Sequence, residues 1–291
     1  MKMLGTYKNG NYSIKIYEDG TKIRETEDDV FISSFPESID LKITNKCNMG
    51  CLYCHEDSNI EGKHGDVLNT KFLDTLKPYT ELALGGGNIL EHPDLPELLR
   101  NLKFRNILAN ITLNQKHFME NRKLVEFLVK YNLIRGLGVS LVSPTNEFIT
   151  AIKQYPNAVI HVINGVVTLE ELKKLYDNNL KVLILGYKEF RRGKNFYSKE
   201  VEDNKQIIYD NISDIIKGFK VVSFDNLAIK QLELKRIFSN KDWNEFYMGD
   251  DGQFTMYIDL VNKKFARNSI SETRYDLLDD ITDMFSVVKS N

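Results

Sequence analysis

The stretch IDLKITNKCNMGCLYCH occupies residues 39–55 and contains every cysteine of the chain, namely Cys47, Cys51 and Cys54. Its first five residues read as a β-strand, and the cysteines follow in what reads as a loop. In α/β folds, the loop after a parallel strand is where chemistry is placed. An odd number of cysteines excludes a closed disulfide framework. The spacing Cys-x3-Cys-x2-Cys therefore needs a chemical explanation.

Three kinds of chemistry could explain this cysteine spacing. Structural zinc usually takes four protein ligands, and His55 or His64 could supply the fourth, although Cys-x3-Cys-x2-Cys-His is not a familiar zinc arrangement. A thiol redox pair could form from Cys51 and Cys54, but it would leave Cys47 unused. An iron–sulfur cluster held by three thiolates uses all three cysteines and leaves one iron open for a substrate or cofactor. We favour the open cluster.

Strand-like and helical patterns alternate along the chain beyond this stretch. Helical patterns begin after Asn69, Asp94, Asn114 and Thr168, and Thr168 with Glu171 has the spacing of a capping box. Such alternation predicts βα units around a curved or closed parallel sheet. The apolar runs that we interpret as its strands are residues 39–43, 82–84, 106–113, 136–141, 159–163, 182–185 and 221–224.

The two ends of the chain have a different pattern. Asn9-Gly10 and Asp19-Gly20 separate short alternating runs, which predicts a small β-meander near the N-terminus. Residues 254–260 predict a strand that turns into another strand through Ala266. We therefore expect an N-terminal hairpin extension over residues 1–36, a core over residues 37–199, and a β-containing C-terminal extension over residues 200–291 that closes the barrel.

Composition excludes several classes of protein. The 291 residues include 39 Lys and Arg against 41 Asp and Glu, for a net charge of −2, so no global basic field favours nucleic acid. No apolar run approaches the roughly 20 residues that span a bilayer, which argues against a membrane partner. The first residues lack the apolar stretch of a signal peptide, so we expect a cytoplasmic protein.

The cysteine motif resembles the signature of the radical S-adenosylmethionine (radical SAM) superfamily, Cys-x3-Cys-x-aromatic-Cys. Cys47, Cys51, Tyr53 and Cys54 match it. The resemblance implies an enzyme with a partial (β/α)6 barrel, whose three cysteines hold a [4Fe–4S] cluster. The open iron would bind the methionine part of S-adenosylmethionine, and an electron from an external flavodoxin- or ferredoxin-like reductant would cleave it. The 5′-deoxyadenosyl radical produced would then remove a hydrogen atom from a substrate.

Several strand ends resemble the cofactor-binding positions of this superfamily. Residues 85–88 read Gly-Gly-Gly-Asn where the family often has Gly-Gly-Glu-Pro, so Asn88 stands in place of the glutamate and Ile89 in place of the proline. Glycines allow a cofactor to approach the backbone closely. The residues that the resemblance assigns to S-adenosylmethionine are Tyr53, Gly85, Gly86, Gly87, Asn88, Asn114, Ser140, Asn164 and Leu185.

The sequence says less about the substrate than about the cofactors. No cysteine follows Cys54, so the cysteine-rich domain with extra clusters found in many peptide-modifying members is not expected. A peptide or protein could add a strand to the terminal β-hairpins, whereas a nucleotide or other small molecule could use the basic residues 188–194 to hold an anionic group. A non-catalytic zinc or iron–sulfur interaction module is the alternative outside enzymes. Our candidates for substrate contact are Asp225, Tyr257, Asp259 and Arg267.

Overall fold

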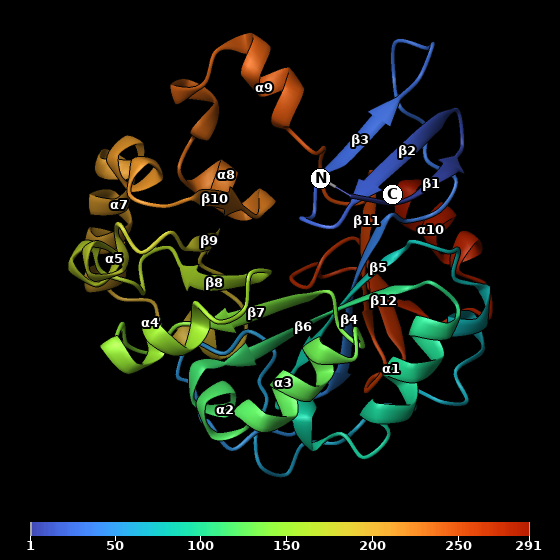
Figure 1. The fold of residues 1–291 in the computed structure, drawn as a ribbon, viewed down its shortest axis with the longest axis horizontal. Coiled ribbons are helices and arrows are strands. Elements are labelled where there is room, and N and C mark those ends of the chain that lie inside the picture. Colours follow the sequence, from blue (N-terminus) through green and yellow to red (C-terminus); the bar gives the residue numbers. More distant parts are fainter. Residues whose placement is uncertain (1, 291) are drawn as a thin grey trace.

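A ten-stranded sheet forms the centre of the protein in the computed structural model, which describes residues 2–290. Seven consecutive strands lie parallel in chain order, and the sheet curves into an open barrel (Figure 1). The partial barrel predicted from the sequence is confirmed. These seven strands are β4 (Ser38–Thr44), β5 (Glu81–Gly86), β6 (Leu108–Asn114), β7 (Gly136–Ser140), β8 (Ala158–Ile163), β9 (Lys181–Leu185) and β10 (Val221–Phe224).

Helices cover the outer face of this sheet, where alternate strand residues such as Ile39, Leu41 and Ile43 are fully buried in one continuous core. The capping box at Thr168 and Glu171 is present at the start of its helix. The helices of the barrel are α1 (Leu95–Phe104), α2 (Gln115–Glu120), α3 (Arg122–Lys130), α4 (Asn146–Ile152), α5 (Leu169–Leu175), α6 (Arg192–Phe196) and α7 (Lys199–Lys217).

Two helical segments differ from the sequence prediction. The pattern after Asn69 forms only a 3-10 turn, η1 (Lys71–Thr75), because Pro78 follows closely and disfavours helical backbone before it. The pattern after Asn114 is divided into α2 and α3 at Asn121, whose backbone leaves the helical region with a φ of −116°. A second 3-10 turn, η2 (Ile89–Glu91), follows β5.

The predicted N-terminal meander is confirmed as a separate three-stranded antiparallel sheet. Its turns contain Gly10 and Gly20, which both have positive φ. The sheet contacts the rest of the chain through Tyr12, which packs edge-on against Phe254. The strands are β1 (Met3–Asn9), β2 (Tyr12–Tyr17) and β3 (Lys22–Glu25).

The C-terminal extension adds strands to the edge of the main sheet that carries β4. β11 (Thr255–Asp259) lies parallel beside β4, and β12 (Lys264–Ala266) and β13 (Tyr275–Asp276) continue antiparallel. The extension expected over residues 200–291 supplies strands at both ends of the sheet, because β10 pairs with β9 and β11 pairs with β4. Within residues 2–290, β10 and β13 remain unpaired edges, so the barrel stays open. The helical elements are α8 (Asn226–Gln231), η3 (Leu234–Ile237), α9 (Asn240–Phe246) and α10 (Ile281–Ser290).

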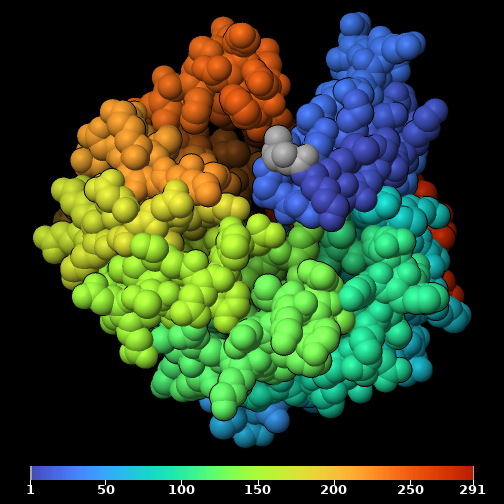
Figure 2. All heavy atoms as spheres, viewed as in Figure 1, coloured from blue at the N-terminus to red at the C-terminus, as the bar shows by residue number. Residues whose placement is uncertain are grey.

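The division into residues 1–36, 37–199 and 200–291 stays a prediction, since strands from both sides of residue 200 share one sheet. Figure 2 shows a hollow in the molecular surface between the orange segment that carries α8 and α9 and the blue N-terminal strands. Among the described residues, no helix is long and apolar enough to cross a membrane.

Candidate active site

The inner face of the barrel encloses a cavity of about 440 Å³. Because strand residues alternate between the two faces of a sheet, the inward positions of β4 are Asp40 and Lys42, between the outward Ile39, Leu41 and Ile43. The cavity extends from these side chains to the loop after β4. The C-terminal strand ends of a barrel are where binding groups normally gather.

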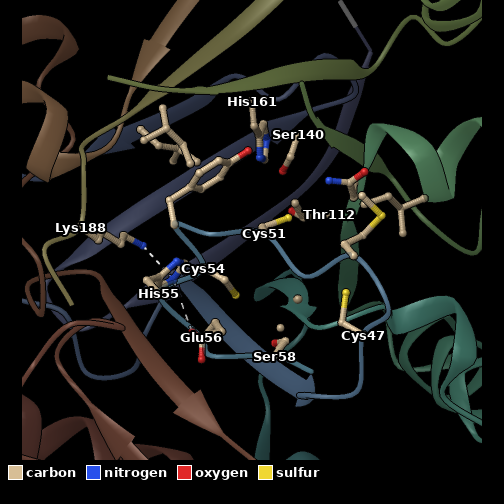
Figure 3. Close-up of a pocket in the computed structure, with 18 of the residues that line it drawn as sticks. Cys47, Cys51, Cys54, His55, Glu56, Ser58, Thr112, Ser140, His161 and Lys188 are labelled. Carbon is tan, nitrogen blue, oxygen red and sulfur yellow. Dashed lines mark hydrogen bonds and ion pairs between the residues drawn. The ribbon is translucent and has the colours of Figure 1, made fainter. Parts of the chain in front are cut away.

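The three cysteine thiols all line this cavity, and Figure 3 shows them facing one space. A turn brings Cys54 back toward Cys51, whose carbonyl accepts from the Cys54 amide at 3.2 Å. Gly50, between the first two cysteines, has a φ of +60°. Burial raises the pKa of both Cys47 and Cys51, and the neighbouring Cys54 raises both further.

The donor set of this loop fits an iron–sulfur cube. Thiolates are the natural ligands of such clusters, and each thiolate of a cube binds a different iron, so the sulfur atoms need not converge on one point. In the described part of the chain, no three His, Cys, Asp or Glu side chains are arranged to hold a single metal ion.

The glycine run after β5 is joined to the cysteine loop. The Gly87 amide donates to the carbonyl of Thr44 at 2.8 Å, and the Asn88 amide donates to that of Lys46 at 2.7 Å. A Cβ at Gly87 would lie 2.1 Å from the Lys46 carbonyl oxygen, so only glycine permits this approach. A Cβ at Gly85 would meet no atom within 4 Å and would project into open space.

Most of the residues predicted to bind S-adenosylmethionine come together at the cavity, but two do not. The residues that line the cavity are Tyr53, Gly85, Gly86, Gly87, Asn114, Ser140 and Leu185. The Asn88 side chain instead caps η2 and donates to Glu91. The Asn164 side chain is fully buried and donates to Gln231 at 3.1 Å, outside the cavity lining.

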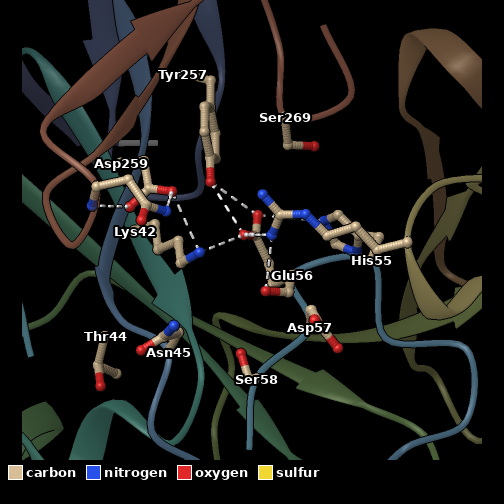
Figure 4. A network of polar contacts seen from close by, with 12 residues as sticks. Lys42, Thr44, Asn45, His55, Glu56, Asp57, Ser58, Tyr257, Asp259 and Ser269 are labelled. Carbon is tan, nitrogen blue, oxygen red and sulfur yellow. Dashed lines mark hydrogen bonds and ion pairs between the residues drawn. The ribbon is translucent and has the colours of Figure 1, made fainter. Parts of the chain in front are cut away.

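Glu56 ties the cysteine loop to the barrel through a buried network (Figure 4). Its carboxylate accepts from the Tyr257 hydroxyl at 2.9 Å and lies 2.9 Å from the Lys42 ammonium. Lys42, whose side chain is 1% exposed, also lies 3.2 Å from the carboxylate of Asp259. The network therefore connects the loop two residues after Cys54 with both β4 and β11.

The basic residues 188–194 are divided between this loop and the cavity. Arg191 donates to the carbonyl of Glu56 at 2.8 Å, and Arg192 donates to the carbonyl of Ser58. Arg192 also lines the cavity, as does Lys188, which donates to the Ser269 hydroxyl at 2.9 Å. The two arginines thus hold the cysteine loop, which the sequence interpretation as an anion-binding loop did not anticipate.

Of the four residues predicted to contact substrate, Tyr257 alone lines the cavity. Asp259 pairs with Lys42, and Asp225 caps α8 while accepting from the Gly186 amide at 2.8 Å. The Arg267 side chain packs beside Gly252. The sequence could not indicate the partner of Asp259, because Lys42 lies 217 positions earlier in the chain.

Asp40 and His161 are among the cavity residues that sequence reasoning missed, and the alternation of their strands could have indicated them. Ser140 and His161 are register partners on the adjacent strands β7 and β8, and Figure 3 shows their side chains next to each other. Burial lowers the pKa of His161 to about 4, so its imidazole is neutral at physiological pH.

The chain is similar in sequence to several known proteins, each over a different part of its length. A probable GTP 3′,8-cyclase of Methanococcus maripaludis is 32% identical over 76 residues, which cover 24% of this chain and 25% of that protein. The chain thus spans about a quarter of the length of this relative. The GTP 3′,8-cyclase of Chlorobaculum tepidum is 28% identical over 42% of this chain and 39% of its own. An uncharacterized protein of Methanocaldococcus jannaschii is 23% identical over 77% of this chain and 74% of its own.

Solved structures share the fold. SuiB of Streptococcus suis bound to S-adenosylmethionine has a TM-score of 0.61 and 16% identity, over 89% of this chain and 69% of its own. SuiB bound to the precursor peptide SuiA has a TM-score of 0.59 and 18% identity, over 87% of this chain and 65% of its own.

The sequence model of the Radical SAM superfamily matches residues 41–191, which is more than half of the chain and includes the cysteine loop, the glycine run and strands β5 to β9. Members of this family are enzymes that use a [4Fe–4S] cluster and S-adenosylmethionine. With this match and the geometry described above, the chain belongs to the radical SAM superfamily.

Proposed function

We propose that Cys47, Cys51 and Cys54 hold the [4Fe–4S] cluster and that S-adenosylmethionine binds beside it in the barrel. The observation that carries this proposal is that all three thiols and residues 85–87 line one cavity. When bound, the cluster supplies the electron that cleaves S-adenosylmethionine reductively, which yields the 5′-deoxyadenosyl radical that takes a hydrogen atom from the substrate.

The protein's own residues bind and shield the cofactor in this proposal. Gly85 leaves room for the methionine part because it has no side chain to project into the cavity. Ser140 and Asn114 offer polar side chains at adjacent strand ends, and Leu185 offers an apolar surface for the adenine. The barrel wall keeps bulk water away from the reacting groups.

We propose a peptide or protein as the substrate. In support, the fold is shared with SuiB over most of the chain, and SuiB binds a precursor peptide. The relatives named GTP 3′,8-cyclase suggest a nucleotide instead, but the first of them aligns with only about a quarter of this chain. Arg191 and Arg192 are engaged with the cysteine loop, and Asp40 adds a carboxylate to the cavity, which disfavours a triphosphate.

The test of the cofactor assignment is anaerobic reconstitution with iron and sulfide. The wild-type chain should bind about four irons and convert S-adenosylmethionine to 5′-deoxyadenosine when reduced. The triple Cys47→Ala, Cys51→Ala and Cys54→Ala variant should lose both properties. If the wild-type protein binds zinc and makes no 5′-deoxyadenosine, the proposed function is wrong.

The test of the substrate class compares candidate substrates labelled with deuterium at carbon. Transfer of deuterium into 5′-deoxyadenosine identifies the molecule that loses hydrogen. Peptides encoded beside the gene should transfer label, whereas GTP should not. If deuterium is transferred only from GTP, the proposal of a peptide substrate is wrong and the substrate is a nucleotide.

A further inference from the structure

Asp40 is an inward-facing carboxylate in the middle of β4. Its strand neighbours Ile39 and Leu41 are buried in the outer core, whereas Asp40 is exposed because it faces the cavity. Tyr257 of β11 and Ala83 of β5 are its register partners on the two adjacent strands. The small Ala83 side chain leaves space beside the carboxylate.

Among residues 2–290, no hydrogen bond or ion pair is formed by the Asp40 side chain. Lys188 is the cation with the largest electrostatic effect on Asp40, but its ammonium is engaged elsewhere. It donates to the Ser269 hydroxyl and lies 3.3 Å from the His55 ring. Enclosure by the barrel raises the pKa of Asp40, Lys188 lowers it, and the charges of Asp225, Asp251 and Glu56 raise it, which together place it at about 6. The carboxylate is thus ionised at pH 7.5 and lacks a cation of its own.

Of the three carboxylates whose charge acts on Asp40, Glu56 is already paired with the Lys42 ammonium at 2.9 Å, whereas within residues 2–290 Asp225 and Asp251 form no ion pair. Asp225 accepts from the backbone amides of Gly186 and Ala228, and Asp251 accepts from the side chains of Asn226 and Asn268. All of these donors are uncharged. A carboxylate without a paired cation on the wall of a cavity attracts a cation, so this part of the cavity is suited to a positively charged group.

We propose that Asp40 binds a positively charged amino group of the substrate, such as a lysine side chain, inside the barrel. This inference rests on the proposed function and specifies the substrate further. Asp40 lies four residues before the end of β4, about 13 Å along a strand that rises roughly 3.3 Å per residue. An ammonium held there would leave the rest of the substrate between Asp40 and the cysteine loop, where the reaction occurs.

The test uses the reconstituted enzyme with S-adenosylmethionine bound, at pH 7.5, and two probes of nearly equal shape. Nα-acetyl-lysine methylamide carries the ammonium, and Nα-acetyl-norleucine methylamide replaces it with a methyl group. Calorimetry should show the lysine probe binding at least about tenfold more tightly, as a charged hydrogen bond in an enclosed site provides. Asp40→Asn should remove this preference, whereas Asp203→Asn on the exposed face of α7 should keep it.

A pH series on the wild-type protein tests the same point without a substitution. The lysine preference should fall between pH 7.5 and pH 5.5 as Asp40 becomes protonated, with Glu56, Asp225, Asp251, Lys188 and Tyr257 as the surrounding ionisable groups. If Asp40→Asn protein does not fold, this series decides the matter, and a preference that persists at pH 5.5 would overturn the proposal.

Other outcomes also overturn it. Equal binding of the two probes to the wild type would show that no cation site exists, and loss of S-adenosylmethionine affinity in Asp40→Asn would assign the carboxylate to the cofactor. Failure of the proposed function has a different signature, since the wild type would then make no 5′-deoxyadenosine whichever probe it prefers.

Discussion

Replacing Lys42 with methionine should strongly destabilise the protein, because Lys42 is the central cation of the network behind the cysteine loop. Its side chain is 1% exposed and lies 2.9 Å from Glu56 and 3.2 Å from Asp259, which are 9% and 0% exposed. Methionine keeps the length of the side chain but leaves two buried carboxylates without their nearest charge. Removing one partner of a buried ion pair costs about 3–5 kcal/mol, and we expect a loss in this range.

The assay is urea denaturation of the metal-free protein followed by far-ultraviolet circular dichroism. The matched control is Lys71→Met, which removes an ion pair of 2.7 Å between two side chains that are each 74% exposed, and its midpoint should stay close to that of the wild type. Adding Glu56→Gln to Lys42→Met should recover part of the lost stability, since it neutralises one uncompensated carboxylate. The reasoning is refuted if Lys42→Met unfolds at the same urea concentration as Lys71→Met.

Three further predictions concern the glycine run, the basic segment and the cavity histidine. Gly87→Ala should impair folding, because its Cβ would lie 2.1 Å from a backbone oxygen. Gly85→Ala should fold normally but bind S-adenosylmethionine more weakly, because its Cβ meets no protein atom within 4 Å. Circular dichroism measures the folding of each variant, and equilibrium dialysis measures its binding of S-adenosylmethionine. Arg192→Ala should reduce the iron retained after reconstitution, because Arg192 holds the carbonyl of Ser58 and pairs with Asp57 at 3.1 Å; retention equal to that of Lys194→Ala would contradict this. Burial lowers the pKa of His161 to about 4 from its ordinary 6.5, so the unfolded chain binds more protons between these values and the free energy of unfolding falls as pH drops through this window. His161→Gln should lose less stability between pH 7.5 and pH 5 than the wild type does, as urea midpoints at the two pH values will show.

Local patterns predicted the barrel and the cysteine loop well. The apolar runs located the seven parallel strands within a few residues, since a strand buried against helices must carry apolar residues at alternate positions. The glycine turns at Gly10 and Gly20 located the N-terminal meander, because positive φ favours glycine. The helix expected after Asn69 failed because packing and Pro78 outweighed its apolar spacing.

The site was predictable only where one short segment supplies it. Cys47, Cys51 and Cys54 could be grouped from their spacing, but nothing local distinguishes Asn114, which lines the cavity, from Asn164, which binds Gln231 behind it. Asn114 is the last residue of β6 and Asn164 follows the last residue of β8, and the direction of each side chain depends on where its strand ends in the curved sheet. The resemblance therefore assigned both asparagines to S-adenosylmethionine, whereas the tertiary structure places only Asn114 at the cavity.

The sequence by itself indicated the family of this protein, because the three cysteines of the family signature lie within eight residues and need no distant partner to be seen. Only the tertiary structure decided what surrounds that loop. Glu56 meets Tyr257 across 201 positions of the chain, and Lys42 meets Asp259 across 217, because β11 pairs in parallel with β4. Asp40 likewise faces a cavity only because the sheet curves around it, since a strand pattern shows which residues share a face but not what that face encloses.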